Sequence, residues 1–449
     1  MMEKWNSKAL FRMVLPLVIE QLLAVTMGAA DTVMMSFVGE HAVSGVNIVD
    51  NINNLLIIAF GALSTGGAVV TSQYIGRRDT KNAGVAAKQL IHVVTLISVF
   101  IMIFTFFLRR PLISIIYGSI GADVMEAAGT YFMITCLSYP VLAIYNANAA
   151  LFRAVGNSRI TMWIALLVNV LNIAGNALFI LVFHWGVAGA AVSTLISRTT
   201  AAVVTLVLLH KGHARPIFIQ GLLKVRFIRS MLHNILNVGI PSGLESSMFQ
   251  FGRLLTQRIL PTFGTAAIAG NAIASVINSF SFMPGMAYGI ALLTIVGQCV
   301  GAGDYDAAKK QCVRIMKLAY ITLVILSGLI YIFMDPLISL FNLSEEAHRY
   351  AVSFLQIHCI SMAIGWPMSF ALPNALRAAG DARYVMIIAT VSMWLVRVSA
   401  AYLLSYTLGM GPLGVWVSMG ADFICRGAFY LARWKSGKWQ TKKVIDNEE

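Results

Sequence analysis

LPLVIEQLLAVTMGAADTVM (residues 15–34) is apolar enough to cross a bilayer, yet it contains Pro16, Glu20 and Asp31. About 20 apolar residues cross a hydrocarbon core of about 30 Å. Charged side chains in such a core are costly, and they mark ion pathways, binding sites and ion pairs. Eleven residues separate Glu20 from Asp31, which puts both on nearly one helix face, roughly 16 Å apart along the axis. We therefore predict a membrane helix whose acidic face points away from lipid.

The composition extends this prediction to the whole chain. Of its 449 residues, 58% are hydrophobic and 12% are charged, whereas a soluble domain is about 25% charged. The mean hydropathy is +0.77, and apolar runs of membrane-spanning length recur. We predict an all-α membrane protein with twelve transmembrane helices, near residues 12–36, 46–72, 88–108, 128–150, 160–183, 187–209, 233–260, 268–298, 313–334, 351–375, 384–408 and 413–431.

Basic residues are unevenly distributed among the predicted loops. Most of the 33 Lys and Arg fall in alternate loops and in the two terminal segments, and cytoplasmic loops of membrane proteins carry such an excess. We therefore expect both termini in the cytoplasm of a multi-pass plasma-membrane protein, which in a bacterium is the inner membrane. Topology thus explains the net charge of +14 without a nucleic-acid partner. The expected partners are the lipid bilayer and a small-molecule substrate, and the expected state is a monomer.

The sequence repeats itself at a shift of 225 residues, without a gap across roughly 64 residues. The aligned pairs are Pro16 and Pro241, Glu20 and Glu245, Gly39 and Gly264, Gly45 and Gly270, Asn53 and Asn278, Gln73 and Gln298, Gly76 and Gly301, and Asp79 and Asp304. Each half holds six spans, so both halves start on the same side of the membrane. We predict two six-helix lobes related by a pseudo-two-fold axis along the membrane normal. Their expected limits are an N-terminal lobe (1–209), a basic cytoplasmic linker (210–232), a C-terminal lobe (233–431) and a cytoplasmic tail (432–449).

Several ordered motifs resemble the multidrug and toxic compound extrusion (MATE) transporters. They are the first helix with its Pro, Glu and DTVM, SQYIGRRD (72–79) with its counterpart GQCVGAGD (297–304), GIPSGLE (239–245), and LFRAVGNSR (151–159) with its counterpart ALRAAGDAR (375–383). The resemblance covers nearly the whole chain. It implies a V-shaped pair of six-helix bundles that export amphiphilic, usually cationic compounds while Na⁺ or H⁺ enters.

Asp31 fits the position of the acid that this family carries in its first helix. Some members have a second acid in the fifth helix, where this chain has Asn176, and others have a Glu where it has Phe249. We expect Asp31, Asn172, Asn176 and Thr194 to form the ion-coupling site, with Asp31 as the residue that binds Na⁺ or exchanges a proton. A carboxylate among neutral oxygen donors suits a hard cation. The alternative is that these polar side chains only join neighbouring helices.

Glu20 and Glu245 lie four residues after a proline in each half. A proline removes a backbone donor and crowds the preceding turn, so a carboxylate beside it could take part in coupling, gate the cytoplasmic side or stabilise the distorted turn. Because the pair is repeated, a structural role common to both lobes competes with coupling.

The substrate cavity is expected to combine a polar stretch of the second span with soft and aromatic side chains of the seventh and eighth spans. Thioethers and aromatic faces adapt to varied amphiphilic ligands. Arg253 would repel a cationic compound unless a carboxylate neutralises it, which leaves an anionic or zwitterionic substrate open. The candidates are Asn47, Asp50, Asn54, Met248, Phe249, Arg253, Phe280 and Met283.

Arg397 and Asp422 are expected to form an ion pair inside the C-terminal lobe. They lie at similar distances from the turn around Met410, so an antiparallel hairpin places both roughly 18–20 Å from that turn. Their counterparts at a shift of 225 are Asn172 and Ser197, both neutral. The competing interpretation is that Arg397 faces the cavity alone and meets an anionic group of the substrate.

These features predict a secondary active antiporter that exports amphiphilic, cationic compounds or drugs. The alternative is a flippase for lipid-linked oligosaccharides or for lipids, from a related transporter class with a similar two-lobe plan, and a flippase for lipid-linked sugars calls for a more cationic central cavity. We find no catalytic Ser/His pairing, no metal-ligand spacing and no phosphate-binding GxxxxGK[ST] loop in the sequence. We therefore expect a protein that is not an enzyme and uses no cofactor besides its coupling ion.

Overall fold

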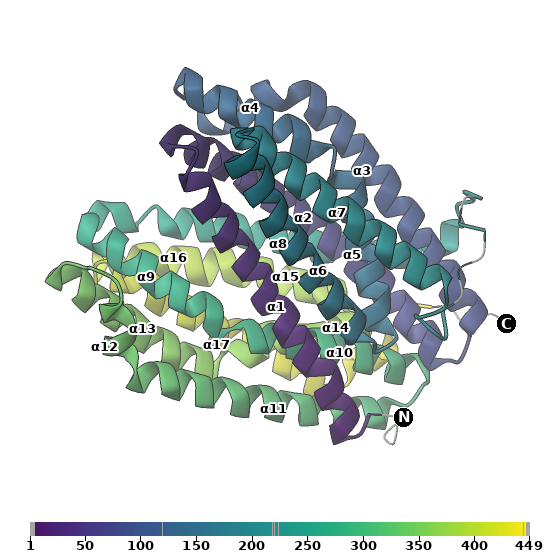
Figure 1. Cartoon of the computed structure of the whole chain (residues 1–449). Helices are drawn as coiled ribbons and strands as arrows, with labels where there is room; N and C mark the ends of the chain where they lie inside the picture. The colour runs from purple at the N-terminus through teal and green to yellow at the C-terminus, as the bar shows by residue number, and fades with distance from the viewer. Residues whose placement is uncertain are drawn as a thin grey trace. The chain divides into compact units, whose positions relative to one another are not determined.

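The computed structural model describes residues 5–118, 120–217, 219, 221–222, 224–442 and 444–445, and these residues form helices and loops without a strand. Contacts divide the chain into two compact units (Figure 1). We call Leu15–Gly243 the N-terminal unit, and Met1–Val14 with Leu244–Glu449 the C-terminal unit. Both divisions fall inside long helices.

The N-terminal unit contains most of α1 and the first half of α8. A bend of 52° separates α4 from α5, where Pro140 stands in the first turn of α5 and favours a helix start there. Its helices are α1 (Ser7–Ser36), α2 (Glu40–Gly76), α3 (Thr80–Tyr117), α4 (Ala122–Cys136), α5 (Tyr139–Ala154), α6 (Ser158–Asn176) with the π-helix η1 (Ala177–Val182), α7 (Gly186–His210) and α8 (Arg229–Gln257).

The C-terminal unit has more interrupted helices. A bend of 60° follows α13, at Pro367. Its elements after α8 are η2 (Leu260–Phe263), α9 (Thr265–Ser281), α10 (Met283–Gly301), α11 (Tyr305–Ile332), α12 (Met334–Ser339), α13 (Glu345–Ile364), η3 (Pro367–Ala371), α14 (Leu372–Ala378), α15 (Ala382–Val391), η4 (Ser392–Val398), α16 (Ser399–Tyr402), η5 (Leu403–Thr407), α17 (Leu413–Lys435) and η6 (Lys438–Thr441).

Each of the twelve predicted spans falls on a helix or on a bent or interrupted run of helices. The span expected at 268–298 is two helices, α9 and α10, because Pro284 starts a new helix. Among the described residues, eight helices are each long and apolar enough to cross a membrane, and two bent pairs bring the number to ten. The remaining long helices, α8 and α17, carry Glu245 and Arg253, and Asp422 and Arg426, which make them more polar.

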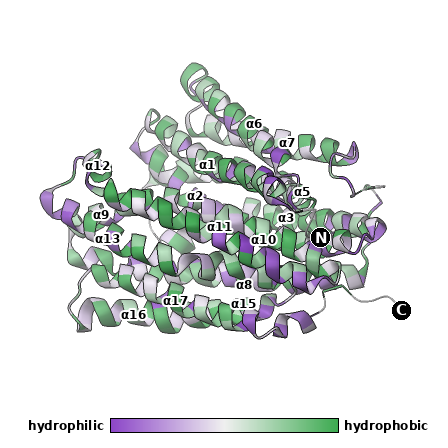
Figure 2. Ribbon diagram, turned by 90° about the horizontal axis from the view of Figure 1, so that it is seen from below, coloured by the Kyte–Doolittle hydropathy of each residue, from purple (hydrophilic) through white to green (hydrophobic). Residues whose placement is uncertain are grey.

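The outer faces of the helices are apolar, as a lipid environment requires. Along α3, the exposed side chains Leu96, Phe100, Ile103 and Phe107 recur at helical spacing, and Phe100 and Phe107 are 70% and 74% exposed. A soluble protein rarely leaves such a stripe uncovered. Figure 2 shows that hydrophobic residues dominate the helix bodies while hydrophilic residues gather at helix ends and loops.

The backbone repeats where the sequence repeats. Asp79 caps α3 by accepting from the Asn82 backbone N–H at 2.9 Å, and Asp304 caps α11 in the same way, from the Ala307 N–H at 3.0 Å. Left-handed backbone conformations also recur, at a shift of 224 or 225 residues. The matched pairs are Gly39 and Gly264, Arg78 and Gly303, Gly156 and Gly380, His184 and Gly409, and Gly186 and Gly411.

One close helix crossing is repeated as well. A Cβ atom on Gly45 of α2 would lie 2.9 Å from the Ala127 Cβ on α4, and a Cβ on its counterpart Gly270 of α9 would lie 2.7 Å from the Ala347 carbonyl oxygen on α13. Small residues let membrane helices approach this closely. The two halves therefore share local packing as well as backbone turns.

The segment between α7 and α8 is fastened to α3. Lys88 donates to the Gly221 carbonyl at 2.6 Å, and Gln89 donates to the Arg226 carbonyl at 2.6 Å. Gln89 also accepts from the Ile228 backbone N–H at 3.2 Å. The basic segment that we expected to link the lobes thus packs as part of the N-terminal unit.

Glu20 and Glu245 each form a buried ion pair within their own unit. Glu20 accepts hydrogen bonds from the Arg153 guanidinium at 3.0 Å and from the Thr161 hydroxyl at 2.6 Å. Glu245 receives Arg377 through both carboxylate oxygens, at 2.7 and 2.6 Å. Arg153 and Arg377 occupy matching places in the repeated motifs around 151–159 and 375–383. These contacts support the structural interpretation of both glutamates, while a role in coupling or gating stays a prediction.

We predict that Glu245→Gln destabilises the protein by about 3 kcal/mol, because removing one partner leaves a buried charge unpaired. Arg377→Gln in the same background should recover much of the loss by leaving two neutral amides. Thermal unfolding of the purified protein, followed by the monodisperse fraction after heating, measures both effects. Glu346→Gln removes an exposed acid of α13 and serves as the control. A double variant less stable than the single variant would contradict the prediction.

Candidate functional site

The structure brings the four predicted ion-coupling residues into one hydrogen-bonded network in the N-terminal unit. Asn176, at the end of α6, donates to Asp31 of α1 at 2.6 Å. The same amide lies 3.4 Å from the Asn172 side-chain oxygen, and Asn172 donates in turn to Thr194 of α7 at 3.4 Å. The three neutral members are buried, and Asp31 is partly accessible. The partly accessible carboxylate of Asp31 thus lies at one end of a buried series of hydrogen-bonded polar side chains.

One acceptor in this network lacks a partner among the described residues. The side-chain oxygen of Asn176 is buried and accepts no hydrogen bond from any of them, which costs free energy unless a bound species contacts this oxygen. Two species next to Asp31 could satisfy this oxygen. One is a cation bound by the Asp31 carboxylate and the Asn176 oxygen. The other is a proton on Asp31, whose O–H would then donate a hydrogen bond to the Asn176 oxygen. Among the described residues no group of three His, Cys, Asp or Glu could hold a metal ion. A site here would therefore rely on one carboxylate and neutral oxygens, which suits Na⁺ or H⁺.

The local backbone supports this placement. A π-helical segment, η1, begins directly after Asn176, and such segments often accompany functional sites because they redirect side chains. The Ser193 hydroxyl of α7 donates to the Asn172 carbonyl at 2.8 Å and ties the two helices together at this level. The asparagine stripe of α6 is therefore held by both backbone and side-chain contacts.

Asp50 lies beside this network with partners that the sequence analysis did not identify. Tyr131 of α4 donates to Asp50 at 3.3 Å. Arg198 of α7 acts electrostatically on both Asp31 and Asp50 and donates to the Ser138 hydroxyl at 2.8 Å. As a cation inside a predicted span, Arg198 carried the signal that marks functional residues in membranes. The N-terminal unit thus gathers two carboxylates and one guanidinium.

The C-terminal unit gathers the opposite balance of charge. Asp422 of α17 lies 3.2 Å from Arg426, one turn along the same helix, and 4.0 Å from Arg397. Ser392 donates to its other oxygen at 2.6 Å. The distance to Arg397 is long for a hydrogen bond, and Arg426 is the nearer partner. Sequence reasoning missed Arg426, although its spacing from Asp422 is that of a helical ion pair.

Aromatic rings surround these guanidinium groups. The Arg426 guanidinium carbon lies 4.5 Å from the Phe370 ring centre and 5.5 Å from that of Phe249. The Arg397 guanidinium lies 5.4 Å from the Phe249 ring. Aromatic faces stabilise cations at such distances. Phe249, where some MATE members resembling this chain carry a Glu, therefore packs against two arginines.

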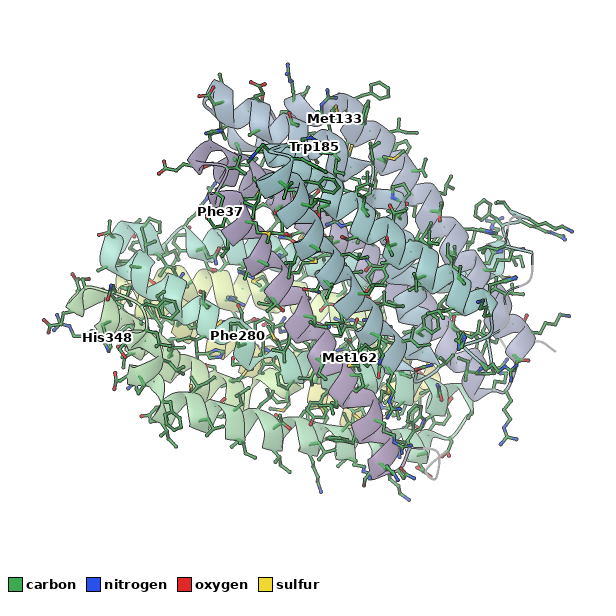
Figure 3. All side chains as sticks on the ribbon, in the orientation of Figure 1. Phe37, Met133, Met162, Trp185, Phe280 and His348 are labelled. Atoms are coloured by element: carbon green, nitrogen blue, oxygen red, sulfur yellow. The ribbon has the colours of Figure 1, made fainter. Side chains whose placement is uncertain are left out.

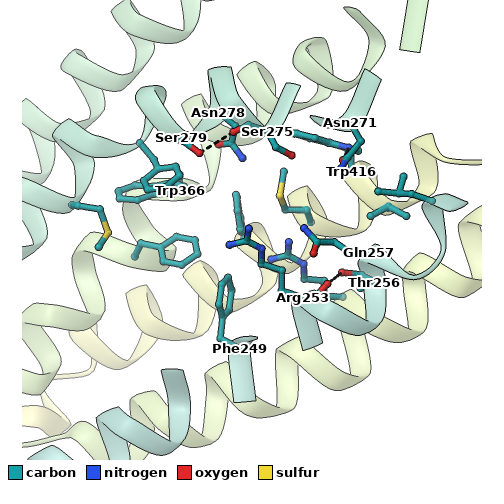
Figure 4. Close-up of a pocket in the computed structure, with 18 residues that line it drawn as sticks. Phe249, Arg253, Thr256, Gln257, Asn271, Ser275, Asn278, Ser279, Trp366 and Trp416 are labelled. Atoms are coloured by element: carbon teal, nitrogen blue, oxygen red, sulfur yellow. Dashed lines mark hydrogen bonds between the residues drawn. The ribbon is translucent and has the colours of Figure 1, made fainter. Parts of the chain in front are cut away.

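The predicted cavity residues separate into two groups. Phe249 and Arg253 line a cavity of about 320 Å³ in the C-terminal unit (Figure 4), whereas Met248, Phe280 and Met283 are not among its lining residues. Phe282 and Met286 line it instead. Met283 is buried, and Phe280 is 48% exposed on α9 (Figure 3). Asn47 and Asn54 of α2 are exposed.

Comparison with known proteins places this architecture in a family. The family model MatE matches residues 16–178 and 241–403, two segments that begin 225 residues apart. The chain is 30% identical over 440 residues to the uncharacterized transporter YisQ of Bacillus subtilis, covering 97% of this chain and 95% of YisQ. It is 27% identical over 459 residues to the probable multidrug resistance protein NorM of Thermotoga maritima, covering 98% of this chain and 95% of NorM.

Solved structures show the same fold. A MOP superfamily transporter from Pyrococcus furiosus, described as having a binding pocket of reverse polarity, matches with a TM-score of 0.89 at 20% identity over 97% of each chain. A MATE transporter in a bent conformation matches with a TM-score of 0.88 at 20% identity, over 96% of this chain and 95% of its own. These matches confirm the predicted all-α fold of twelve membrane helices in two lobes. The chain belongs to the MatE family of multidrug efflux transporters, and it is a membrane transporter, not an enzyme.

Proposed function

We propose that this protein is a secondary active antiporter that exports amphiphilic organic compounds, cationic ones among them, in exchange for Na⁺ or H⁺. It works as a monomer in the plasma membrane, the inner membrane of a bacterium, with both termini in the cytoplasm. The network of Asp31, Asn176, Asn172 and Thr194, with its unpartnered Asn176 oxygen, carries the proposal. The names of relatives such as NorM support drug export.

The exchange follows from charge. A carboxylate inside the membrane can neutralise one cation well, but a second cation at the same place meets a site with no net negative charge left. Arg198 already offsets part of the charge of Asp31 and Asp50. Entry of the coupling ion at Asp31 therefore weakens the binding of a cationic substrate to this unit. By thermodynamic linkage, substrate binding weakens the binding of the coupling ion equally.

The flippase alternative has one observation in its favour, the arginine-rich C-terminal unit. A flippase for lipid-linked sugars needs no exchanged cation at Asp31. Dependence of transport on Asp31 and on an ion gradient therefore distinguishes the antiporter from the flippase.

We predict that Asp31→Asn reduces gradient-driven ethidium efflux from proteoliposomes to the level of protein-free vesicles, because the amide cannot carry the charge that couples the two movements. The variant should still insert as folded protein. Asp306→Asn, which removes an acid with an 88% exposed side chain, should transport at the original rate. Undiminished efflux by Asp31→Asn would refute the assignment.

We further predict that the rise in melting temperature caused by Na⁺, compared between the original protein and Asn176→Ala, identifies the coupling ion. If Na⁺ binds at Asp31, Na⁺ should raise the melting temperature of the original protein more than K⁺ does, and the variant should need at least about tenfold more Na⁺ for the same rise. The reason is the loss of the Asn176 oxygen as a ligand. If the original protein shows no Na⁺ effect and its ethidium efflux follows an imposed pH gradient alone, the coupling ion is H⁺. An equal Na⁺ response in both proteins would exclude Asn176 as a ligand.

A further inference from the structure

The cavity of the C-terminal unit has the size and lining of a small-molecule site. Its volume of about 320 Å³ lies within the range of ligand pockets, roughly 300–1,000 Å³. Among the eighteen residues that line it, the large aromatic side chains come from α8, the junction between α9 and α10, the bend between α13 and η3, η3 itself, and α17. Neutral polar side chains come from α8 and α9. Figure 4 shows Arg253 among these residues, with Phe249 on one side and Asn278 and Ser275 across the space.

The charge of this lining has one sign. Arg253 and Arg397 are the charged residues among the eighteen, and none of the described residues that line the cavity carries a carboxylate. Asp422 is not one of the lining residues, and its carboxylate lies 3.2 Å from Arg426 and 4.0 Å from Arg397. Arg253 and Arg426 both act electrostatically on Arg397. Arg397 and Arg426 thus share one carboxylate, and the mutual repulsion of the three guanidinium groups favours an added anion.

All three arginines have side-chain donors that no described residue accepts. Arg397 is 7% exposed, and its Nε and Nη1, like Nε and Nη2 of Arg426, are buried without a hydrogen-bond acceptor among the described residues. For Arg253, no hydrogen bond or ion pair of the guanidinium is found within the described ranges. Buried donors without acceptors, such as those of Arg397, are costly, whereas Arg253 is exposed and its guanidinium can be reached from the cavity. Asp422 and the Phe370 ring lie nearest to Arg426, while Arg397 is farther from that carboxylate, at 4.0 Å, and lines the cavity together with Arg253.

The repeat shows that this charge is specific to the C-terminal half. At a shift of 225 residues, Arg253 corresponds to Gly28, Arg397 to Asn172 and Arg426 to Ala201. In the opposite sense, Asp31 of the N-terminal unit corresponds to Thr256, which lines the cavity. One duplicated framework therefore carries an acidic site in one half and a basic site in the other.

We propose that the cavity of the C-terminal unit binds an amphiphilic organic anion, such as an aromatic carboxylate. The anionic group meets Arg253 and Arg397, and the apolar body packs between Trp366, Trp416 and Phe282. Guanidinium groups recognise carboxylates through charge-assisted hydrogen bonds. The proposal rests on the transport function above and extends its substrate range from cations to compounds with an anionic group, zwitterions included.

The test uses the purified full-length protein in nanodiscs, without any ion gradient, and three naphthalene probes. These are 2-naphthoate, its neutral isostere 2-naphthamide, and 2-naphthylmethylammonium. Equilibrium dialysis, read by naphthalene fluorescence and corrected with protein-free nanodiscs, gives the three Kd values. We expect 2-naphthoate to bind at least about tenfold more tightly than either other probe, as loss of one charge-assisted hydrogen bond implies. Equal affinities, or tightest binding of the ammonium probe, would overturn the proposal.

Variants place the site. Arg253→Gln should weaken 2-naphthoate binding about tenfold and leave 2-naphthamide binding unchanged, whereas Arg253→Lys should keep most of the affinity for the anion. Arg258→Gln is the matched control, since it removes an exposed arginine directly after α8 that does not line the cavity. Unchanged 2-naphthoate binding by a monodisperse Arg253→Gln protein would rule out this cavity. Because no gradient is used, failure here leaves the Asp31 efflux test standing, and the reverse also holds.

Discussion

An ionised side chain inside a helical membrane bundle must find its partner in that bundle, because lipid supplies none. The pairs Glu20–Arg153 and Glu245–Arg377 meet this requirement in the same way in each unit. They neutralise charge at matching places of the repeat. Against this neutral framework, incompletely partnered groups identify the sites: Asp31 in one unit, and Arg253 and Arg397 in the other.

The two units surround their charge with different materials. Around Asp31 stand neutral amides and a hydroxyl, which can pass a cation or proton from oxygen to oxygen. Around the arginines stand aromatic rings, which stabilise a cation without neutralising it. A guanidinium held in this way keeps its attraction for an anion. The chemical difference between the two sites therefore arises from side chains on a duplicated backbone. Each site also has a π-helical segment, η1 directly after Asn176 and η4 around Arg397.

Much of this could be predicted from the sequence, because hydropathy, periodicity and the repeat act over long stretches. The Asp31 network was predictable since asparagines at helical spacing inside a membrane have few alternatives to one another. The break between α9 and α10 was not predicted, because the apolar pattern continues across Phe282 and only Pro284 marks it. Arg426 was overlooked because Asp422 was matched by depth with Arg397 and not by spacing along its own helix. The aromatic enclosure needs several helices in place and has no local pattern.

The left-handed turn shared by Arg78 and Gly303, with φ of 66° and 72°, shows how such a chain can evolve. An L-residue with a side chain pays roughly 1–2 kcal/mol in this conformation compared with its right-handed form, yet one half keeps arginine where the other has glycine. Where the two halves share a backbone conformation, each half shows which residue types that conformation accepts in the other half. In a protein built from two such halves, a single substitution can bring a residue of one half to the matching position of the other half while the backbone fold is preserved.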